Sequence, residues 1–536
     1  MNGKVFKPTP QNETFFTDLS ALYKVDDIPN SDNVSIQIFD ANNDGIDDIL
    51  VINKTKGNIL SLFKGVKNSS YANITSISNL PTNVEIYLST IADINKDGFN
   101  DIVLTAKING VYSLLFYINR SNFNFSLYKQ YQLQEEFQTF GIRSMSSFDY
   151  DVDGDEDIIL TSYYSKENTP GYMCVLENNY WGSFSNIDFR FKSITNHWNE
   201  KTILADLNND NLIDIFSATS WSQDNVLIND GENFKHEQDR FPTQIKTETI
   251  DVLLSDFDID GDLDIFTVGR ADFIRVYQNN GLGYFTEITS EVFEKEILSN
   301  DIRYSFNLNI GDFNNDKFVD LIVSVNYDES DKTLLFLNQK GKKFKHIEKP
   351  FQNMITPLSN SSISDIDNDG DVDIYAATKN HNSLWINSLD NNNSIDIILK
   401  GIESSSNALG SKIWVYSKNG LDNSDSLLGY KQLGSEQITK RSTNSYKLHF
   451  GLANHKECNV KVRFLSGEEI IINNVVAGST MVITEHDLLF TFFYQLPGKI
   501  FRFFEQTNNQ LYVVVIIFSH LFLLLGLWTG LSKLNW

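Results

Sequence analysis

The sequence predicts an all-β chain in which a seven-bladed β-propeller is followed by a small β domain and a single C-terminal transmembrane helix. Three observations favour this organisation: an acidic motif that recurs seven times, a further set of strand-like runs after the last motif, and a long uncharged apolar run near the end. With 536 residues, of which 41% are hydrophobic and 13% aromatic, the chain can bury several cores.

The repeats carry the main signal. The first motif is DANNDGIDD at residues 40–48, and the other six begin at Asp93, Asp149, Asp206, Asp256, Asp312 and Asp365, so that successive copies start 50 to 57 residues apart. Each motif lies between two apolar runs, which indicates strand, loop and strand. Further along each unit, runs joined by Asn, Asp and Gly, such as VLINDGENFKHE at 226–237, favour a hairpin. Each unit is therefore predicted to be a four-stranded antiparallel sheet of the size of a propeller blade.

The ends of the repeat region suggest how the ring closes. The seventh unit ends after SLWINS at 383–388 without a fourth strand, whereas TFFTDLS at 14–20 precedes the first unit and resembles the fourth strand of the fifth. We predict that residues 14–19 complete the seventh blade and remove two open sheet edges. The propeller would then span residues 14–388.

Beyond the repeats, the sequence predicts four segments. Residues 389–393 read as an Asn-rich linker, and residues 394–486 read as a second, smaller β domain. Residues 487–510 carry aromatic and basic side chains and could lie at a membrane interface, with a disordered stalk as the alternative. Residues 511–531 are 21 residues without a formal charge, long enough to span a bilayer, with a buried helix as the alternative.

The acidic motif points to a hard cation. Side chains at loop positions 1, 3 and 5 direct carboxylate or amide oxygens inward, glycine at position 6 allows a sharp turn, position 7 offers its carbonyl, and Asp at position 9 closes the cage. Calcium accepts six to eight such oxygens with flexible geometry, which fits better than magnesium. The alternative is a plain Asx turn, which seven copies with one spacing disfavour. The predicted ligands are Asp40, Asn42, Asp44, Ile46 and Asp48; Asp93, Asn95, Asp97, Phe99 and Asp101; Asp149, Asp151, Asp153, Asp155 and Asp157; Asp206, Asn208, Asp210, Leu212 and Asp214; Asp256, Asp258, Asp260, Asp262 and Asp264; Asp312, Asn314, Asp316, Phe318 and Asp320; Asp365, Asp367, Asp369, Asp371 and Asp373.

The seven sites are not expected to be equal. Those built on Asp149, Asp256 and Asp365 carry Asp rather than Asn at position 3 and should bind calcium more tightly, because ligand charge raises affinity. Asn211 and Lys317 replace the glycine of the fourth and sixth loops. Asparagine tolerates a left-handed conformation, whereas Lys317 adds strain and a positive charge, so the sixth site is predicted to be the weakest of up to seven.

Composition and motifs disfavour other classes. A net charge of −26 has the wrong sign for nucleic-acid binding. The two cysteines are too few to indicate a disulfide framework. No histidine pair at metal spacing, nucleophile elbow or glycine-rich phosphate loop is present, so an enzyme is the less favoured alternative.

The repeats resemble the FG-GAP or VCBS type found in the propeller of integrin α-subunits, over residues 14–388. The second domain resembles the ASPIC/UnbV module of cartilage-acidic-type proteins, through SSSNALGSKIWVYS at 404–417, KLHFGLAN at 447–454 and VRFLSGEEIIINNV at 462–475. This resemblance implies a calcium-dependent extracellular or periplasmic adhesion or scaffold module with no established catalytic residues.

We therefore expect a membrane-anchored recognition protein that binds a protein or glycan on a propeller face. The connections between second and third strands lie opposite the metal loops and carry candidate contact residues, although these could instead pack between blades. The candidates are Tyr163, Tyr164, Trp221, Arg270, Tyr327 and His381.

The predicted location and assembly each have an alternative. The propeller is expected outside the cell, in a lumen or in the periplasm, where calcium is abundant, although the N-terminus shows no apolar signal segment and the flanking charges weakly favour the opposite orientation. A structural subunit that packs against other membrane subunits is the second hypothesis.

Overall fold

The computed structural model describes most of the chain up to His486. The described residues are 14–25, 35–53, 59–67, 70–81, 84–162, 173–179, 182–187, 198–242, 247–270, 274–295, 297, 302–327, 330–354, 356–378, 381–389, 393–438 and 441–486. The chain divides into two compact units, Met1–Glu485 and His486–Trp536. The predicted segments 487–510 and 511–531, and most of the linker, lie outside the described residues.

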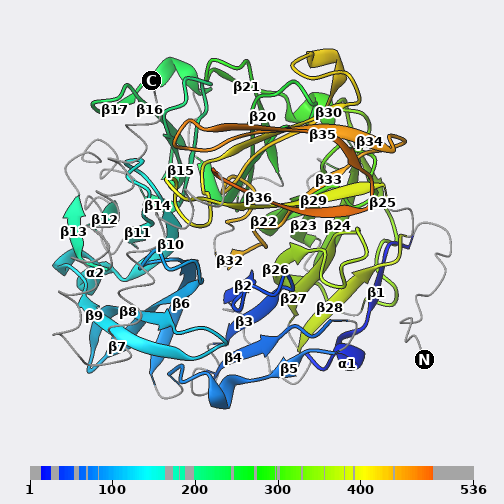
Figure 1. Cartoon of the computed structure of the whole chain (residues 1–536). Helices are drawn as coiled ribbons and strands as arrows, with labels where there is room; N and C mark the ends of the chain where they lie inside the picture. The colour runs from blue at the N-terminus through cyan, green and yellow to red at the C-terminus, as the bar shows by residue number, and fades with distance from the viewer. Residues whose placement is uncertain are drawn as a thin grey trace, which may run out of the picture. The chain divides into compact units, whose positions relative to one another are not determined.

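Consecutive groups of strands form antiparallel sheets (Figure 1), of which the fourth and fifth are joined into one eight-stranded sheet. The groups are β2 (Ser35–Phe39), β3 (Asp48–Asn53), β4 (Ile59–Lys64) and β5 (Ala72–Asn73); β6 (Glu85–Ala92), β7 (Asp101–Ile108), β8 (Val111–Asn119) and β9 (Phe125–Gln132); β10 (Ile142–Phe148), β11 (Asp157–Ser162), β12 (Met173–Asn178) and β13 (Phe184–Ile187); β14 (Trp198–Ala205), β15 (Asp214–Ser222), β16 (Asn225–Asn229) and β17 (Phe234–His236); β18 (Thr247–Ser255), β19 (Asp264–Gly269), β20 (Arg275–Asn279) and β21 (Phe285–Glu287); β22 (Ile302–Gly311), β23 (Asp320–Tyr327), β24 (Ser330–Asn338) and β25 (Phe344–Ile347); and β26 (Leu358–Ser364), β27 (Asp373–Thr378) and β28 (Asn382–Asn387). This is the all-β, propeller-like architecture that the sequence predicts.

The last group takes its fourth strand from the start of the chain. β1 (Phe16–Asp18) pairs antiparallel with β28, with Phe16 opposite Asn387 and Asp18 opposite Trp385. Phe16 is fully buried and stacks on Phe351 at a centroid distance of 5.1 Å. The two ends of the repeat region are therefore joined by backbone hydrogen bonds.

Hydrophobic cores lie between neighbouring sheets. One core combines residues of β3 and β4 with residues of β6, β7 and β8, and others join the next pairs of sheets in the same way. Another joins the first sheet to β27 and β28. Because both faces of each sheet are covered, inner strands such as DILVIN in β3 are buried throughout rather than alternating with solvent.

A second set of strands forms two further sheets. One has the order β33 (Leu448–Gly451), β29 (Ser394–Lys400) and β36 (Ser479–Thr484), with β29 parallel to β36. The other has the order β31 (Leu427–Gln432), β30 (Lys412–Ser417), β34 (Glu457–Arg463) and β35 (Glu469–Val476). Their core continues into that of the third and fourth repeats, through Phe148, Met173 and Leu204. Residues 394–485, which we call the C-terminal domain, thus pack on the repeats within one compact unit.

A hairpin of the C-terminal domain enters the ring of sheets. Its strand β32 (Ser442–Thr443) pairs parallel with β2 and lies at the centre of the ring in Figure 1. Asn444 accepts a hydrogen bond from the backbone of Ile363 at 2.9 Å, and the carbonyl of Ser435 accepts one from Leu254 at 3.3 Å. We call residues 433–438 and 441–445 the central hairpin.

Helices are short. They are α1 (Ser20–Tyr23), α2 (Glu135–Phe140) and α3 (Thr289–Val292), with 3-10 turns η1 (Thr75–Ile77), η3 (Gln238–Arg240) and η4 (Ser424–Ser426). Within the described part of the chain, no helix has the length and apolar character needed to cross a membrane.

Candidate metal centres

All seven acidic loops share one set of backbone hydrogen bonds. The first Asp accepts from the backbone N–H of the sixth residue at 2.6–3.1 Å. The fifth accepts from the seventh at 2.8–3.2 Å. The ninth accepts from the second residue at 2.9–3.2 Å and from the end of the third strand of its own sheet at 2.7–2.8 Å. Because an ionised carboxylate has about four acceptor positions, these bonds shape the loop and still leave lone pairs for a cation.

The loops also share two left-handed residues. Position 4 has φ between 52° and 62° in every loop, and position 6 has φ between 71° and 94°. Position 6 is glycine in five loops, which adopts a left-handed backbone without strain. In the sixth loop Lys317 adopts a φ of 80° there, which is the strain that the sequence predicts. The left-handed backbone at position 4 was not predicted. Position 4 is occupied by β-branched Val152 and Ile259 in the third and fifth loops, where such a backbone is strongly disfavoured.

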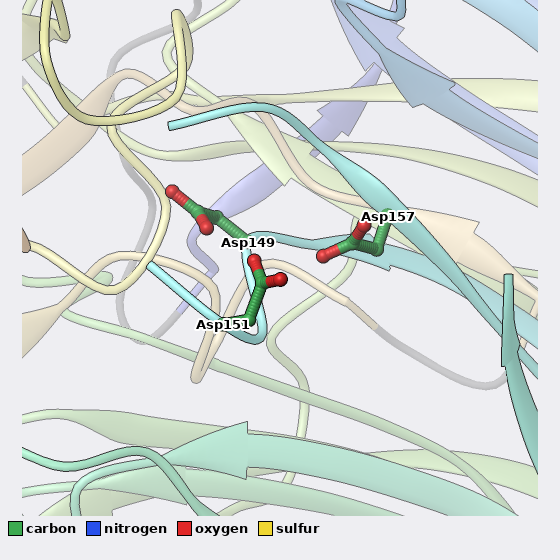
Figure 2. A group of neighbouring side chains, drawn as sticks. All are labelled: Asp149, Asp151 and Asp157. Atoms are coloured by element: carbon green, nitrogen blue, oxygen red, sulfur yellow. The ribbon is translucent and has the colours of Figure 1, made fainter. Parts of the chain in front are cut away.

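Carboxylates gather most closely in three loops. The groups are Asp149 with Asp151 and Asp157, Asp256 with Asp258 and Asp260, and Asp365 with Asp367 and Asp373. In each group one carboxylate oxygen per residue lies within 4.8 Å of the others, close enough to share one metal ion. Figure 2 shows the first group on one loop and the strand that follows it. These three are the loops with Asp at position 3.

Several ligand oxygens in the loops are buried without a hydrogen-bond donor. Oδ1 of Asp149, Oδ1 of Asp258 and Oδ1 of Asn95 have no hydrogen-bond partner, and the Asp149 residue is 0% exposed. Leaving such an acceptor unpaired costs about 1–3 kcal/mol, and more when it is charged. These atoms occupy position 1 or 3 of their loops, where a cation would supply the missing partner.

The electrostatics agree with this geometry. Burial, with repulsion from Asp153 and Asp151, raises the pKa of Asp149 to about 7. Burial also raises the pKa of Asp157 to about 10, although two backbone N–H groups oppose the shift. Burial and the neighbouring Asp97 raise the pKa of Asp93 to about 7. Without a cation the burial and mutual repulsion of these carboxylates disfavour their charged forms, so the donor set fits a divalent metal ion that would offset the charge.

A set of asparagines that sequence reasoning missed ties the loops together. Each ends the third strand of its sheet and donates from Nδ2 to the carbonyl of residue 8 of its own loop at 3.0–3.3 Å. Five of the six also donate to the carbonyl of residue 2 in the preceding loop at 2.7–2.9 Å. The residues are Asn119, Asn178, Asn229, Asn279, Asn338 and Asn387. Their recurrence after an apolar run, as in YIN, LIN, FLN and WIN, was the available signal.

The C-terminal domain places basic side chains on the loops. Nζ of Lys412 lies 2.6 Å from Oδ2 of Asp206 in the fourth loop. Nζ of Lys447 donates to the carbonyl of Asp365 at 2.6 Å and to Oδ1 of Asn368 at 3.0 Å in the seventh. His449 lies between Asp396 at 3.0 Å and Asn315 of the sixth loop at 2.7 Å. The fourth loop therefore already has a cation on its first aspartate, which no motif in the sequence indicated.

The predicted contact residues are not all placed. Tyr163 and Tyr164 lie outside the described residues, and of Trp221 in β15 and Tyr327 in β23 only the backbone is described. Arg270 is exposed and lines a cavity. His381 is half-buried, and its carbonyl accepts a hydrogen bond from the hydroxyl of Thr378 at 2.8 Å.

Comparisons with known proteins agree with the repeat pattern. The FG-GAP-like repeat family matches residues 40–104, 93–160, 206–267 and 256–323. The family described as ASPIC and UnbV matches residues 401–488. Among curated proteins, none matches the chain significantly.

Two solved structures have a distant likeness. The "Structure of Dos1 propeller" is 11% identical, covers 67% of this chain and 93% of its own, and gives a TM-score of 0.39. A structure described as "putative exo-beta-1,3-galactanase from Bifidobacterium bifidum s17" is 11% identical, covers 49% and 90%, and gives 0.26. The sheets, the acidic loops and the two family matches together show a chain of FG-GAP-like repeats that is followed by an ASPIC/UnbV domain.

Proposed function

We propose that this protein is a calcium-binding recognition protein without a catalytic role, built on a seven-bladed propeller and held at a membrane by residues 511–531. The observation that carries the proposal is the set of buried, unpartnered oxygens in the acidic loops, above all Oδ1 of Asp149. The seven consecutive strand groups, closed by β1, support the blade count. The apolar run supports the anchor.

Calcium fits the donor set better than other cations. Every side-chain donor in the loops is a carboxylate or an amide, and oxygen-only sets of this kind suit hard cations. The strained turns at Val152 and Ile259 belong to loops that bring three carboxylates together. A bound ion would offset the cost of this strained backbone geometry. When bound, calcium would neutralise these carboxylates and cross-link each loop.

The loops are expected to differ in affinity. The third, fifth and seventh loops combine close carboxylates with Asp at position 3. The fourth carries Lys412 on Asp206, and the sixth carries Lys317 in a left-handed turn. We expect the first group to fill first and the fourth and sixth loops to fill last.

Thermal unfolding with and without EGTA tests the proposal. We expect the melting temperature at pH 7.5 to fall by 10 °C or more on chelation and to recover with calcium but not with an equal concentration of magnesium. Asp149→Asn keeps the shape of the side chain but removes one carboxylate charge from the third loop, so it should reduce the rise in melting temperature that calcium produces. Asp239→Asn, outside the loops, should leave that rise unchanged. A melting temperature indifferent to EGTA would refute the proposal.

The same measurement has a distinctive pH dependence. In metal-free protein, the pKa values of Asp93 and Asp149 are raised to about 7, above the unfolded value near 4. The folded state then binds more protons than the unfolded state between these values, so stability must fall as pH rises from about 4 to about 7. Calcium should remove this decline. Protein that has been freed of calcium with EGTA at pH 7.5 and dialysed into metal-free buffer should therefore melt higher at pH 5 than at pH 7.5.

A structural subunit of a larger membrane assembly is the second candidate. Purification in mild detergent distinguishes the two, because a stoichiometric membrane partner that remains bound in EGTA would favour the subunit.

A further inference from the structure

A cavity of about 430 Å³ lies at the opposite end of the innermost strands from the metal loops. Tyr304 and Phe306 lie near the start of β22, which ends at Gly311 beside the sixth loop. Asn360 lies near the start of β26, which ends at Ser364 beside the seventh. We call this end of the ring the far end, and the end that carries the acidic loops the loop end.

The C-terminal domain completes this cavity. Along the central hairpin, Ser445 bonds to Asp47 at the loop end, and Ser442 accepts a hydrogen bond from Asn360 nearer the far end. Arg441 comes next and lines the cavity. Its backbone carbonyl accepts a hydrogen bond from the hydroxyl of Ser35 at 2.7 Å. The hairpin thus passes along the inner strands and delivers an arginine to the far end.

The charge of the lining opposes that of the protein as a whole. Arg143, Arg270 and Arg441 meet in one cavity of a chain whose net charge is −26. Arg143 is fixed by its ion pair with Glu200, and Asp251, which also lines the cavity, lies 2.9 Å from Nζ of Lys201. Arg270, by contrast, is exposed at the rim. An arginine fork of this kind suits a planar carboxylate.

The remaining lining groups narrow the ligand further. Asp251 and Asp331 accept hydrogen bonds, and Ser359 and Asn360 can both donate and accept, which suits hydroxyl groups. The two aspartates would repel a densely charged phosphate or sulfate. Tyr304 is 38% exposed, and its ring lies 6.0 Å from that of Phe306, so the cavity offers an apolar face to C–H groups.

A second cavity shares its wall with the first. Arg143 and Arg441 also line a space of about 340 Å³ that contains Tyr87, Tyr112 and Lys107. The rings of Tyr87 and Tyr112 are 5.2 Å apart, and Nζ of Lys107 lies 4.9 Å from the centre of the Tyr112 ring. The same combination of cations and aromatic faces is therefore repeated beside the first cavity.

From these observations we infer that the far end binds a carboxylate-bearing sugar, with Arg270 and Arg441 holding the carboxylate and Tyr304 stacking on the ring. The volume falls within the range of about 300–1,000 Å³ usual for small-ligand sites. The adjoining cavity would take the next sugar of a chain. The inference rests on the proposed recognition function and names its ligand class.

The test is calorimetric titration of the full chain in detergent with glucuronic acid and with digalacturonic acid. Both should bind, the disaccharide more tightly, and glucose should bind at least tenfold more weakly. Sodium acetate and sodium sulfate separate a general anion site from a sugar site. Affinity for either that equals the affinity for glucuronic acid would overturn the inference, as would no acid-sugar binding at 10 mM.

Variants locate the site. Arg270→Ala should weaken glucuronic acid at least tenfold, Arg270→Lys should recover only part of this loss, and Tyr304→Ala should weaken it several-fold. Lys342→Ala, an exposed cation of the hairpin between β24 and β25, is the control and should bind normally. Equal binding by Arg270→Ala and the control would overturn the assignment. If sugar binding fails while EGTA still lowers the melting temperature, this inference fails and the calcium proposal stands. If the sugar binds while EGTA leaves the melting temperature unchanged, the calcium proposal fails and this inference stands.

Discussion

The two ends of the innermost strands carry opposite chemistry. At the loop end, each strand runs into aspartates, and the C-terminal domain covers several of them with Lys412, Lys447 and His449. At the far end, Tyr304 and Phe306 of β22 and three arginines line an open cavity. The two ends therefore differ in what they require: buried carboxylates at the loop end need cations, whereas the exposed Arg270 at the far end can attract an anion.

Removing a cation should therefore cost far more at the loop end. The side chain of Lys447 is 4% exposed, and its Nζ lies 4.0 Å from Oδ2 of Asp47 and donates to the carbonyl of Asp365. Lys447→Met would leave buried carboxylate charge uncompensated, so we expect a loss of about 3–5 kcal/mol in the free energy of unfolding. Urea denaturation in calcium-free buffer measures it.

Lys107→Met at the far end is the matched control. Lys107 is half-buried over the ring of Tyr112, and its loss should cost about 1 kcal/mol or less. Equal losses in the two variants would remove the electrostatic distinction between the ends.

The asparagines sharpen the comparison within the loop end. The side-chain amide of Asn279 donates to Leu263 of its own loop and to Leu207 of the preceding loop, whereas that of Asn229 donates to Ile213 of its own loop. Asn279→Ala should cost about 1–3 kcal/mol because two buried carbonyls lose their donor. Asn229→Ala should cost about 1 kcal/mol less. If both variants unfold at the same urea concentration, the bond between neighbouring sheets contributes nothing.

The smallest expected effect is at Lys317. Lys317→Gly removes the strain of a left-handed backbone at a non-glycine residue, but it also increases the conformational entropy of the unfolded chain. Because the two effects oppose each other, the net change in the free energy of unfolding should be below about 1 kcal/mol. Calcium stoichiometry should nevertheless rise by one ion, because a positive charge leaves the sixth loop.

Lys24→Gly provides the control for this substitution. Lys24 has a similar backbone conformation, with φ of 58°, but lies at the end of α1, outside the acidic loops. Its replacement should leave the stoichiometry unchanged. A sixth loop that stays empty in Lys317→Gly would show that another group, such as His449 beside Asn315, limits binding there.

Sequence reasoning could reach the features that are local and repeated. The acidic loops and their flanking strands recur at one spacing, so seven weak signals reinforce each other, and the propeller-like fold follows. The left-handed turn at position 4 escaped because Asn, Lys, Val and Ile all occupy it, and no residue type marks the backbone there. The asparagines at the ends of the third strands recur visibly in the sequence. Their role could not be predicted, because it depends on a carbonyl of the neighbouring loop that only the folded structure brings close.

The features that were missed depend on distant pairs. Ser445 bonds to Asp47 across 398 residues, and Lys412 reaches Asp206 across 206. No residue spacing or composition in the sequence predicts the central hairpin or the contacts of the C-terminal domain with the acidic loops. Arg270 was reached through its loop position, but Arg441, which lines the same cavity, lies in a different domain.

The central hairpin also bears on the order of assembly. During synthesis every strand of the ring leaves the ribosome before residues 433–445 do, yet the inner strand β2 finds part of its pairing in β32. The first sheet made is therefore among the last to be completed, because its pairing with β32 waits for residues near the end of the described chain.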